Sequence, residues 1–194
     1  MMVTPMPRRV PRPSDRPLRL VPPADLAARF EAALARQDGV DGAHCIHELS
    51  MRGEFPQNIE RSLERLWQSA AKSVPEWLPM RYVSWLPQAY AVAARFEAGA
   101  RGKSNVYLVL LDYSDRRGDT HGVYVGMSEY SPAERFDQHK AGIRAAGSVL
   151  KRGIEVLTGP TLHLQRIRRK DAARIESELA LALADAGIRV EGGH

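Results

Sequence analysis

The sequence predicts an α+β fold in which a small mixed or antiparallel β-sheet is flanked by helices and preceded by a helical N-terminal region. Two β-prone runs, 105–111 and 122–127, lie on either side of a charged loop and predict a hairpin. A helix-start signal at Ser131 follows the second run. Upstream, apolar residues recur at helical spacing. These features divide the chain into residues 1–23, 24–100 and 101–194.

Residues 1–23 have the composition of a flexible basic tail. They contain seven prolines and five arginines against one acidic residue. The arginines could contact phosphates loosely, although an inert leader would have the same composition. No apolar signal-peptide core follows them, and no apolar run is long enough to span a membrane. The single cysteine, Cys45, rules out an internal disulfide, so we expect a reducing, cytoplasmic location.

Residues 24–100 are predicted to form short helices, with breaks at Pro75, Pro79 and Pro87 and a last helix from about Pro87 to Phe96. Two apolar sets keep helical spacing: Leu26, Phe30, Ala33 and Leu34, then Ile59, Leu63, Trp67 and Ala70. We interpret the large aromatic residues as core, with base stacking as the alternative: Trp67, Trp77, Tyr82, Trp85 and Tyr90. The net charge is −2 here, against +4 for 1–23 and +3 for 101–194. The helical region is therefore a poor candidate for the main nucleic-acid surface.

The run His44-Cys45-Ile46-His47 contains residue types that bind zinc. No second ligand pair follows at zinc-finger spacing, so we favour a structural turn or a core contact over a metal site. Residues 98–104 hold two glycines and two basic residues, and we expect them to join the helical region to the following domain.

The predicted hairpin places Tyr107 and Tyr124 on neighbouring strands. After the second strand, Ser131 is the expected N-cap, Pro132 takes the first helical position, and Glu134 completes a capping box. These signals predict a helix that begins at Pro132.

Arg135 and His139 are four residues apart on this helix and therefore lie on one side of it. Phe136 and Ile143 are predicted on the same side, so the polar pair should face the body of the domain. A guanidinium in that position requires an anionic partner.

Basic residues are concentrated after this helix. Lys151 and Arg152 come first, and the alternating run 161–167 predicts a third strand. A basic cluster follows: Arg166, Arg168, Arg169 and Lys170. Such a cluster is either a solvated surface or a contact to the sugar-phosphate backbone.

The last helix is predicted to begin at Lys170 or Asp171 and to end at a Gly187 C-cap. One face carries the apolar residues Ala172, Ile175, Leu179, Leu183 and Ala186. Glu176 lies within that face, whereas Glu178 points away. A carboxylate there needs either an arginine, such as Arg135, or a cation as its partner. Residues 188–193 should form a short edge strand or a closing turn.

The chain from about residue 104 to its end resembles the GIY-YIG nuclease family. Asn105-Val106-Tyr107 resembles the first motif of the family, and Tyr124-Val125-Gly126 resembles the second. By this resemblance Ser128, Arg135 and His139 match a polar residue, the catalytic arginine and a site histidine, and Glu176 matches the metal-binding glutamate. Two positions depart from the pattern: Asn105 replaces a glycine, and no asparagine follows Glu176.

The resemblance implies a metal-dependent endonuclease that hydrolyses phosphodiester bonds in DNA, with RNA as the open alternative. It implies Tyr124 as general base, Tyr107 and His139 as its supporting groups, and Arg135 as the phosphate clamp. Mg²⁺ or Mn²⁺ on Glu176 would complete the site. Substrate contacts are expected from Ser128, Lys151, Arg152, Arg166, Arg168, Arg169 and Lys170.

Two other functions fit the same sequence. The scaffold could bind nucleic acid without cleaving it, although the full set of tyrosine, arginine, histidine and glutamate residues argues for cleavage. Alternatively, the helical region 24–100 binds a protein partner and carries the nuclease as its effector.

Overall fold

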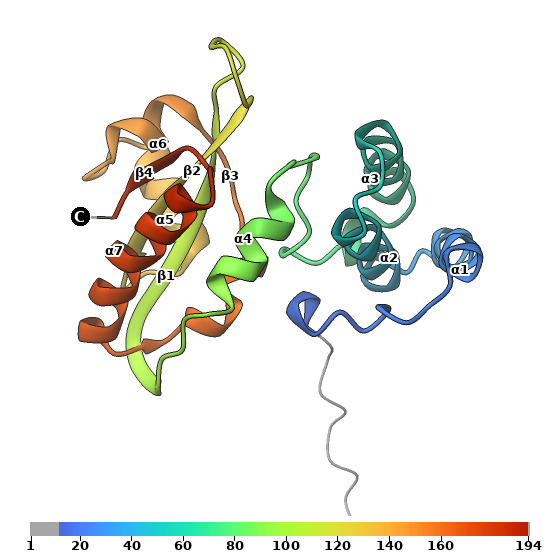
Figure 1. Cartoon of the computed structure of the whole chain (residues 1–194), viewed down its shortest axis with the longest axis horizontal. Coiled ribbons are helices and arrows are strands. Elements are labelled where there is room, and N and C mark those ends of the chain that lie inside the picture. The colour runs from blue at the N-terminus through green and yellow to red at the C-terminus, as the bar shows by residue number, and fades with distance from the viewer. Residues whose placement is uncertain (1–11, 194) are drawn as a thin grey trace, which may run out of the picture.

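The computed structural model describes residues 12–193 and confirms the predicted α+β class (Figure 1). A helical bundle contains α1 (Pro23–Ala35), α2 (Gly39–Met51) and α3 (Pro56–Ala70). A second part contains a sheet of β1 (Ala100–Asp112), β2 (His121–Ser128), β3 (Gly153–Val156) and β4 (Val190–Gly192). Its helices are α5 (Pro132–Lys140), α6 (Gly147–Arg152) and α7 (Arg169–Asp185), and α4 (Leu86–Ala93) lies between the two parts. Short 3₁₀ turns complete the fold: η1 (Pro13–Asp15), η2 (Ala71–Ser73) and η3 (Gly159–Leu164).

The helical bundle has its own apolar core. Leu26 and Phe30 of α1 pack with Ile59 and Leu63 of α3, as their spacing predicts. The run of small and apolar residues in α2, which sequence reasoning did not assign to a helix, forms the most buried helix of this bundle. Among residues 12–193, no helix combines the length and the apolar character needed to cross a bilayer.

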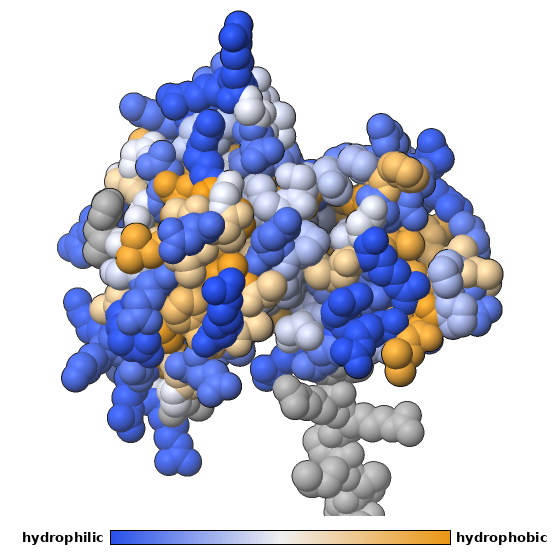
Figure 2. Space-filling model, in the orientation of Figure 1, coloured by the Kyte–Doolittle hydropathy of each residue, from blue (hydrophilic) through white to orange (hydrophobic). Residues whose placement is uncertain are grey.

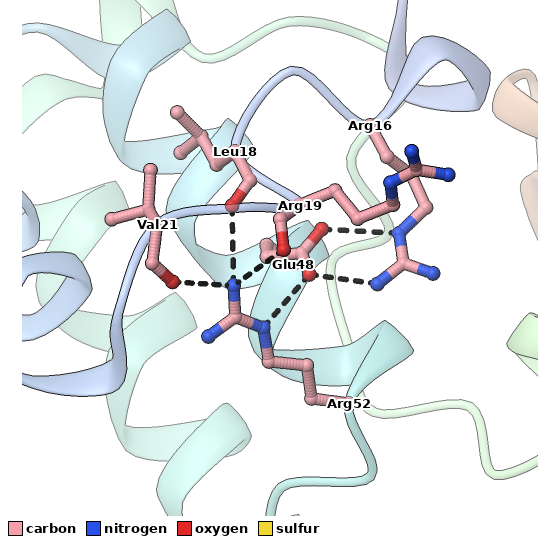
Figure 3. Close-up of polar contacts among 6 residues, drawn as sticks. All are labelled: Arg16, Leu18, Arg19, Val21, Glu48 and Arg52. Carbon is pink, nitrogen blue, oxygen red and sulfur yellow. Dashed lines mark hydrogen bonds and ion pairs between the residues drawn. The ribbon is translucent and has the colours of Figure 1, made fainter.

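The prediction of a flexible tail over 1–23 is wrong for residues 12–21, which we call the N-terminal strap; residues 1–11 lie outside the described part. Glu48 of α2, almost fully buried, accepts hydrogen bonds from Arg16 at 2.7 and 3.1 Å and from Arg52 at 2.8 Å (Figure 3). Burial alone would raise the pKa of Glu48, but these bonds lower it. Arg52 also donates to backbone carbonyls of the strap, those of Leu18, Arg19 and Val21.

The sheet has the strand order β3-β1-β2-β4. β1 pairs antiparallel with both β2 and β3, whereas β4 pairs parallel with β2, so the sheet is mixed. The hairpin of β1 and β2 was predicted, and the structure confirms it. For residues 188–193 an edge strand or a closing turn was predicted, and the structure has the edge strand β4.

Two segments of this part differ from the sequence predictions. Most of the expected junction 98–104 belongs to the sheet, because β1 begins at Ala100. Residues 161–167 do not form a third strand, because 161–164 belong to the turn η3, which has Pro160 near its start and buries Thr161 and Leu164 three residues apart. The Gln165 amide then donates to the Val106 carbonyl at 2.8 Å and replaces a strand partner there.

The sheet is the middle of three layers (Figure 1). Successive side chains of a strand point to opposite faces. One face packs against α4 and α7 through Val106, Leu108, Leu110, Val123 and Val125. The other packs near α5 and α6 through Tyr107, Val109, Leu111, Tyr113 and Tyr124. The predicted helical region 24–100 is thus shared between two cores, since Trp85, Leu86 and Val92 belong to the core of the sheet.

Candidate active site

The two motif tyrosines lie on the same face of the hairpin. Tyr107 is opposite Gly126 in the register of β1 and β2, and Tyr124 is opposite Val109. The ring centroids of Tyr107 and Tyr124 are 6.2 Å apart. A Cβ atom on Gly126 would lie 2.7 Å from both rings, so only glycine fits at this position. The glycine of the second motif therefore makes room for the tyrosine pair.

His139 of α5 fixes the direction of a hydrogen-bond chain. The predicted capping box forms, since Glu134 N–H donates to Ser131 Oγ and Ser131 N–H donates to Glu134. The helix places His139, 1% exposed, against Tyr107. The Ala146 N–H donates to His139 Nδ1 at 3.0 Å, and His139 Nε2 lies 2.9 Å from the Tyr107 hydroxyl oxygen.

The groups that donate to His139 determine which of its ring nitrogens carries the proton. A backbone N–H can only donate, so His139 Nδ1 is the acceptor nitrogen and the ring proton lies on Nε2. Burial and the nearby Arg135 charge lower the pKa of His139 to about 4, so the ring is neutral at pH 7. His139 therefore donates to the Tyr107 oxygen, and the Tyr107 hydrogen is left to donate onward.

Tyr124 is the next phenol beyond Tyr107, with its ring centroid 6.2 Å away. Burial, and then the negative charge of Glu176, raise the pKa of Tyr124; the neighbouring Tyr107 hydroxyl and the charge of Arg135 offset only part of this rise. Burial also raises the pKa of Tyr107, which keeps Tyr107 protonated as a donor. Both phenols are therefore protonated in the surroundings that the protein alone supplies, and a phenolate at Tyr124 would require added positive charge beside it.

The C-terminal strand encloses Tyr124 in a way that the motifs did not indicate. Gly192 has φ +82, and a Cβ atom there would lie 2.8 Å from the Tyr124 ring and 2.3 Å from the Val125 carbonyl oxygen. Tyr124 therefore lies between Gly126 and Gly192. In the sequence, the Gly-Gly pair near the C-terminus was the feature from which this close approach to Tyr124 could have been predicted.

Glu176 lies on α7, as predicted, with 8% of its surface exposed. It belongs to the helix face that carries Ile175 and Leu179, both fully buried. Ala186, predicted on this face, instead follows the helix as its C-cap and is exposed. The short strand β4 pairs with residues 123–125 of β2. Glu176 lies in the helical layer beyond β4, and its negative charge raises the pKa of Tyr124.

Arg135 is half-buried and engaged by the loop that follows α5. Its guanidinium donates to the carbonyls of Ile143 at 3.2 Å and Arg144 at 2.7 Å, and to the Gln138 side chain at 3.0 Å. Ile143 is therefore not on the apolar side of α5 as predicted, because the helix ends at Lys140 and Ile143 is 56% exposed. The charge of Arg135 lowers the pKa of Tyr107, Tyr124 and His139 alike.

The departure at Asn105 has a structural role. Its side chain, in a residue 7% exposed, donates to the Tyr130 carbonyl at 2.9 Å and accepts from the Arg166 N–H at 2.9 Å. Through these two bonds Asn105 connects the segment at Tyr130 and the segment at Arg166 to β1. Ser128, opposite Asn105 in the register, accepts from the Tyr130 N–H at 3.1 Å.

The predicted phosphate-binding residues differ in their surroundings. Arg152 pairs with Asp115 at 2.7 Å and stacks 4.5 Å from the Tyr113 ring centroid, so its guanidinium supports the hairpin loop. Lys151 is exposed. Figure 2 shows hydrophilic side chains over the start of α7, where four basic residues are exposed: Arg166, Arg168, Arg169 and Lys170. The N-terminus of a helix carries a partial positive charge, so basic side chains there are repelled by it. A bound anion would be attracted by both and would reduce this repulsion.

His44 and His47 are core residues, the interpretation favoured from sequence. The His44 ring centroid lies 4.9 Å from that of Trp77, and the His47 centroid lies 4.9 Å from that of Tyr90. Trp85 is buried, and the four other aromatic residues interpreted as core are half-buried: Trp67, Trp77, Tyr82 and Tyr90.

Within residues 12–193, no group of three or more histidine, cysteine, aspartate or glutamate side chains could hold a metal ion. A cation at Glu176 would therefore take one protein carboxylate and complete its coordination with water and substrate oxygens. An oxygen donor of this kind, a buried carboxylate, fits Mg²⁺ or Mn²⁺.

No protein-family model, no curated protein and no solved structure matches this chain.

Proposed function

We propose that this chain is a metal-dependent endonuclease of the GIY-YIG type that hydrolyses phosphodiester bonds in DNA. The observation that carries the proposal is the directed hydrogen-bond chain from the Ala146 N–H through His139 to Tyr107, whose ring lies beside that of Tyr124 with 6.2 Å between the centroids. Two tyrosines side by side, with a buried carboxylate that acts electrostatically on Tyr124, support a general base and a cation site close to one another.

In the proposed reaction, Tyr124 acts as a phenolate and takes a proton from the attacking water. The resulting hydroxide attacks phosphorus, the bond to the leaving oxygen breaks, and that oxygen takes a proton from solvent. A cation at Glu176 would supply positive charge to the phosphate and favour the Tyr124 phenolate. Tyr107 stabilises the phenolate by donating to it.

His139 holds Tyr107 in place and does not carry the proton away. Its Nδ1 lone pair is occupied by the Ala146 N–H, and its Nε2 already carries a hydrogen. Since the pKa of His139 is about 4, accepting a further proton at neutral pH is unfavourable. Of the two roles open to a supporting histidine, proton relay or orientation of the tyrosine, we therefore propose orientation for His139.

Arg135 contributes charge at the same place. Its guanidinium is oriented by the Ile143 and Arg144 carbonyls, and its charge lowers the pKa of both tyrosines. We expect Arg135 to act on the scissile phosphate, and the exposed cluster of Arg166, Arg168, Arg169 and Lys170 to hold flanking phosphates. Because Cys45 is a buried free cysteine, the cytoplasm is the compartment we propose.

The test is cleavage of plasmid, branched and single-stranded DNA by the full chain with Mg²⁺ or Mn²⁺, and with chelator. Tyr124→Phe should reduce the rate by about 10²–10⁴-fold, the usual range for a general base. Tyr90→Phe is the matched control, because the Tyr90 hydroxyl is buried without a hydrogen-bond partner in the described structure. Equal rates for wild type and Tyr124→Phe would remove Tyr124 from the mechanism, and no cleavage of any substrate would overturn the proposal.

A further inference from the structure

A hollow beside the candidate active site presents two exposed apolar side chains next to arginines. It encloses about 470 Å³ and is lined by Ser128, Tyr130, Arg135, Gln138, Ile143 and Arg144. Tyr130 is 55% exposed and Ile143 is 56% exposed. Single exposed apolar residues are common on protein surfaces, but here two of them share one hollow with two guanidinium-bearing residues.

The backbone under both apolar side chains is held from two sides. The Tyr130 N–H donates to Ser128 Oγ at 3.1 Å, and its carbonyl accepts from Asn105 Nδ2 at 2.9 Å. The Ile143 N–H donates to the Gln138 carbonyl at 2.9 Å, and its carbonyl accepts from Arg135 at 3.2 Å. Tyr130 and Ile143 are therefore presented on fixed supports, which lowers the entropy cost when a ligand binds to them.

The hollow shares Arg135 with the surroundings of the tyrosine pair. Tyr124, Gly126 and Ser128 follow one another on one face of β2, and Ser128 supports Tyr130. Arg135 lines the hollow and also lowers the pKa of Tyr107 and Tyr124. A ligand in the hollow is thus next to the group on which Tyr124 acts.

We propose that Tyr130, with Ile143 beside it, stacks on an unpaired nucleobase of the nucleotide next to the scissile phosphate. The inference rests on the proposed nuclease function. An aromatic ring supplies a flat apolar surface for any base, and adjacent guanidinium groups supply the charge that phosphates require. An unstacked nucleotide combines both features, because its base is flat and apolar on its faces and its phosphate is anionic.

This assignment determines the class of substrate. Inside a duplex both faces of a base are covered by its neighbours, so a base can reach Tyr130 only where it is unstacked. The preferred substrate is therefore nucleic acid with at least one unpaired nucleotide at the cleavage position, such as a single strand, a flap or a bulge. Fully paired DNA would bind through its phosphates alone.

The test uses the full chain with chelator, so that binding is measured without cleavage. The probe is a short single-stranded DNA that contains 2-aminopurine, whose fluorescence falls when the base stacks, and a matched blunt duplex serves for comparison. Tyr130→Ala should weaken single-strand binding about thirtyfold, the middle of the range for one stacked base, and should abolish the fall in fluorescence. Tyr130→Phe should preserve both, and the duplex affinity should be unchanged.

Phe55→Ala is the control, because Phe55 is an exposed aromatic residue (72%) at the N-cap of α3, in the helical bundle. It should leave both readouts unchanged. If wild type binds and quenches the probe but Tyr130→Ala does so equally well, the stacking role is refuted while the nuclease proposal stands. If wild type cleaves DNA but binds the duplex and the single strand with equal affinity, the substrate class is refuted. If it neither binds nor cleaves, both proposals are refuted together.

Discussion

His139 Nε2 lies 2.9 Å from the Tyr107 hydroxyl, and the same ring accepts the Ala146 N–H on Nδ1. The bond is therefore directional: it requires a neutral histidine with its hydrogen on Nε2. This single relationship connects a helix terminus, a loop and the central strand of the sheet, and it makes both stability and activity sensitive to the protonation of one buried ring.

Stability should fall in mild acid. The pKa of His139 is lowered by burial to about 4, and that of His47 is also lowered by burial to about 4, from the ordinary 6.5. The unfolded chain binds these protons as pH falls below 6.5 while the folded chain does not, so the free energy of unfolding decreases between pH 6.5 and 4. Each ring should contribute a decrease of at most about 3 kcal/mol over this range. Urea unfolding at several pH values measures it, and His47→Phe should flatten the profile; an identical slope in that variant would contradict the assignment.

Gly126→Ala should damage the site without a change of charge. The added Cβ would lie 2.7 Å from the rings of Tyr107 and Tyr124, and both rings are held by their surroundings. We expect a decrease of about 1–3 kcal/mol in the free energy of unfolding and a large decrease in cleavage. Gly99→Ala is the matched control, because a Cβ there would meet nothing within 4 Å. Equal stability and activity in the two variants would show that the tyrosine pair can shift.

Glu176→Gln should abolish cleavage in Mg²⁺ while DNA binding persists, because the amide keeps the shape of the side chain but loses the charge that a cation requires. Glu178→Gln is the control, since Glu178 is exposed and pairs with Arg174 at 2.7 Å. Isothermal titration with Mn²⁺ gives a readout that does not depend on activity. Mn²⁺ binding that disappears in Glu178→Gln and persists in Glu176→Gln would reverse the assignment.

Arg135→Lys keeps the charge but loses the planar group that reaches both carbonyls of the loop after α5. We expect cleavage to fall by about 10²-fold or more, and the loop to become more accessible to hydrogen exchange. Gln138→Ala removes only one hydrogen bond of Arg135 and should have a small effect. Near-normal turnover of Arg135→Lys would reduce Arg135 to a structural residue.

Replacement of Arg166, Arg168, Arg169 and Lys170 by glutamine should weaken DNA binding for all sequences alike. The slope of log affinity against log salt should become shallower by about one unit for each phosphate that the protein no longer neutralises. Lys151→Gln should have a smaller effect, and Arg152→Gln should act mainly on stability, because Arg152 already pairs with Asp115. An unchanged slope after replacement of all four residues would place the phosphate-binding surface elsewhere.

Features that depend on neighbouring residues could be predicted from the sequence. The β-prone run at 105–111 forms the central strand, and the capping box of Ser131 and Glu134 starts α5 where predicted. The spacing of four residues places Arg135 and His139 on one helix, and the apolar face of α7 places Glu176 inward. These predictions succeed because hydrogen bonds and side-chain periodicity within one element are local.

Features that join distant parts of the chain emerge only in the folded molecule. The strap is fixed because Arg16 and Arg52 meet on Glu48, a partner 32 residues away from Arg16. In the alternating run 161–167, residues 161–164 lie in the 3₁₀ turn η3, and β1 receives a hydrogen bond from the Gln165 amide and a single bridge from Ile167 where a paired strand was predicted. Gly192 encloses Tyr124 only because β4 returns beside β2. Burial and long-range hydrogen bonds outweigh local propensity in each case, since a buried polar group without a partner costs more than a change of backbone conformation.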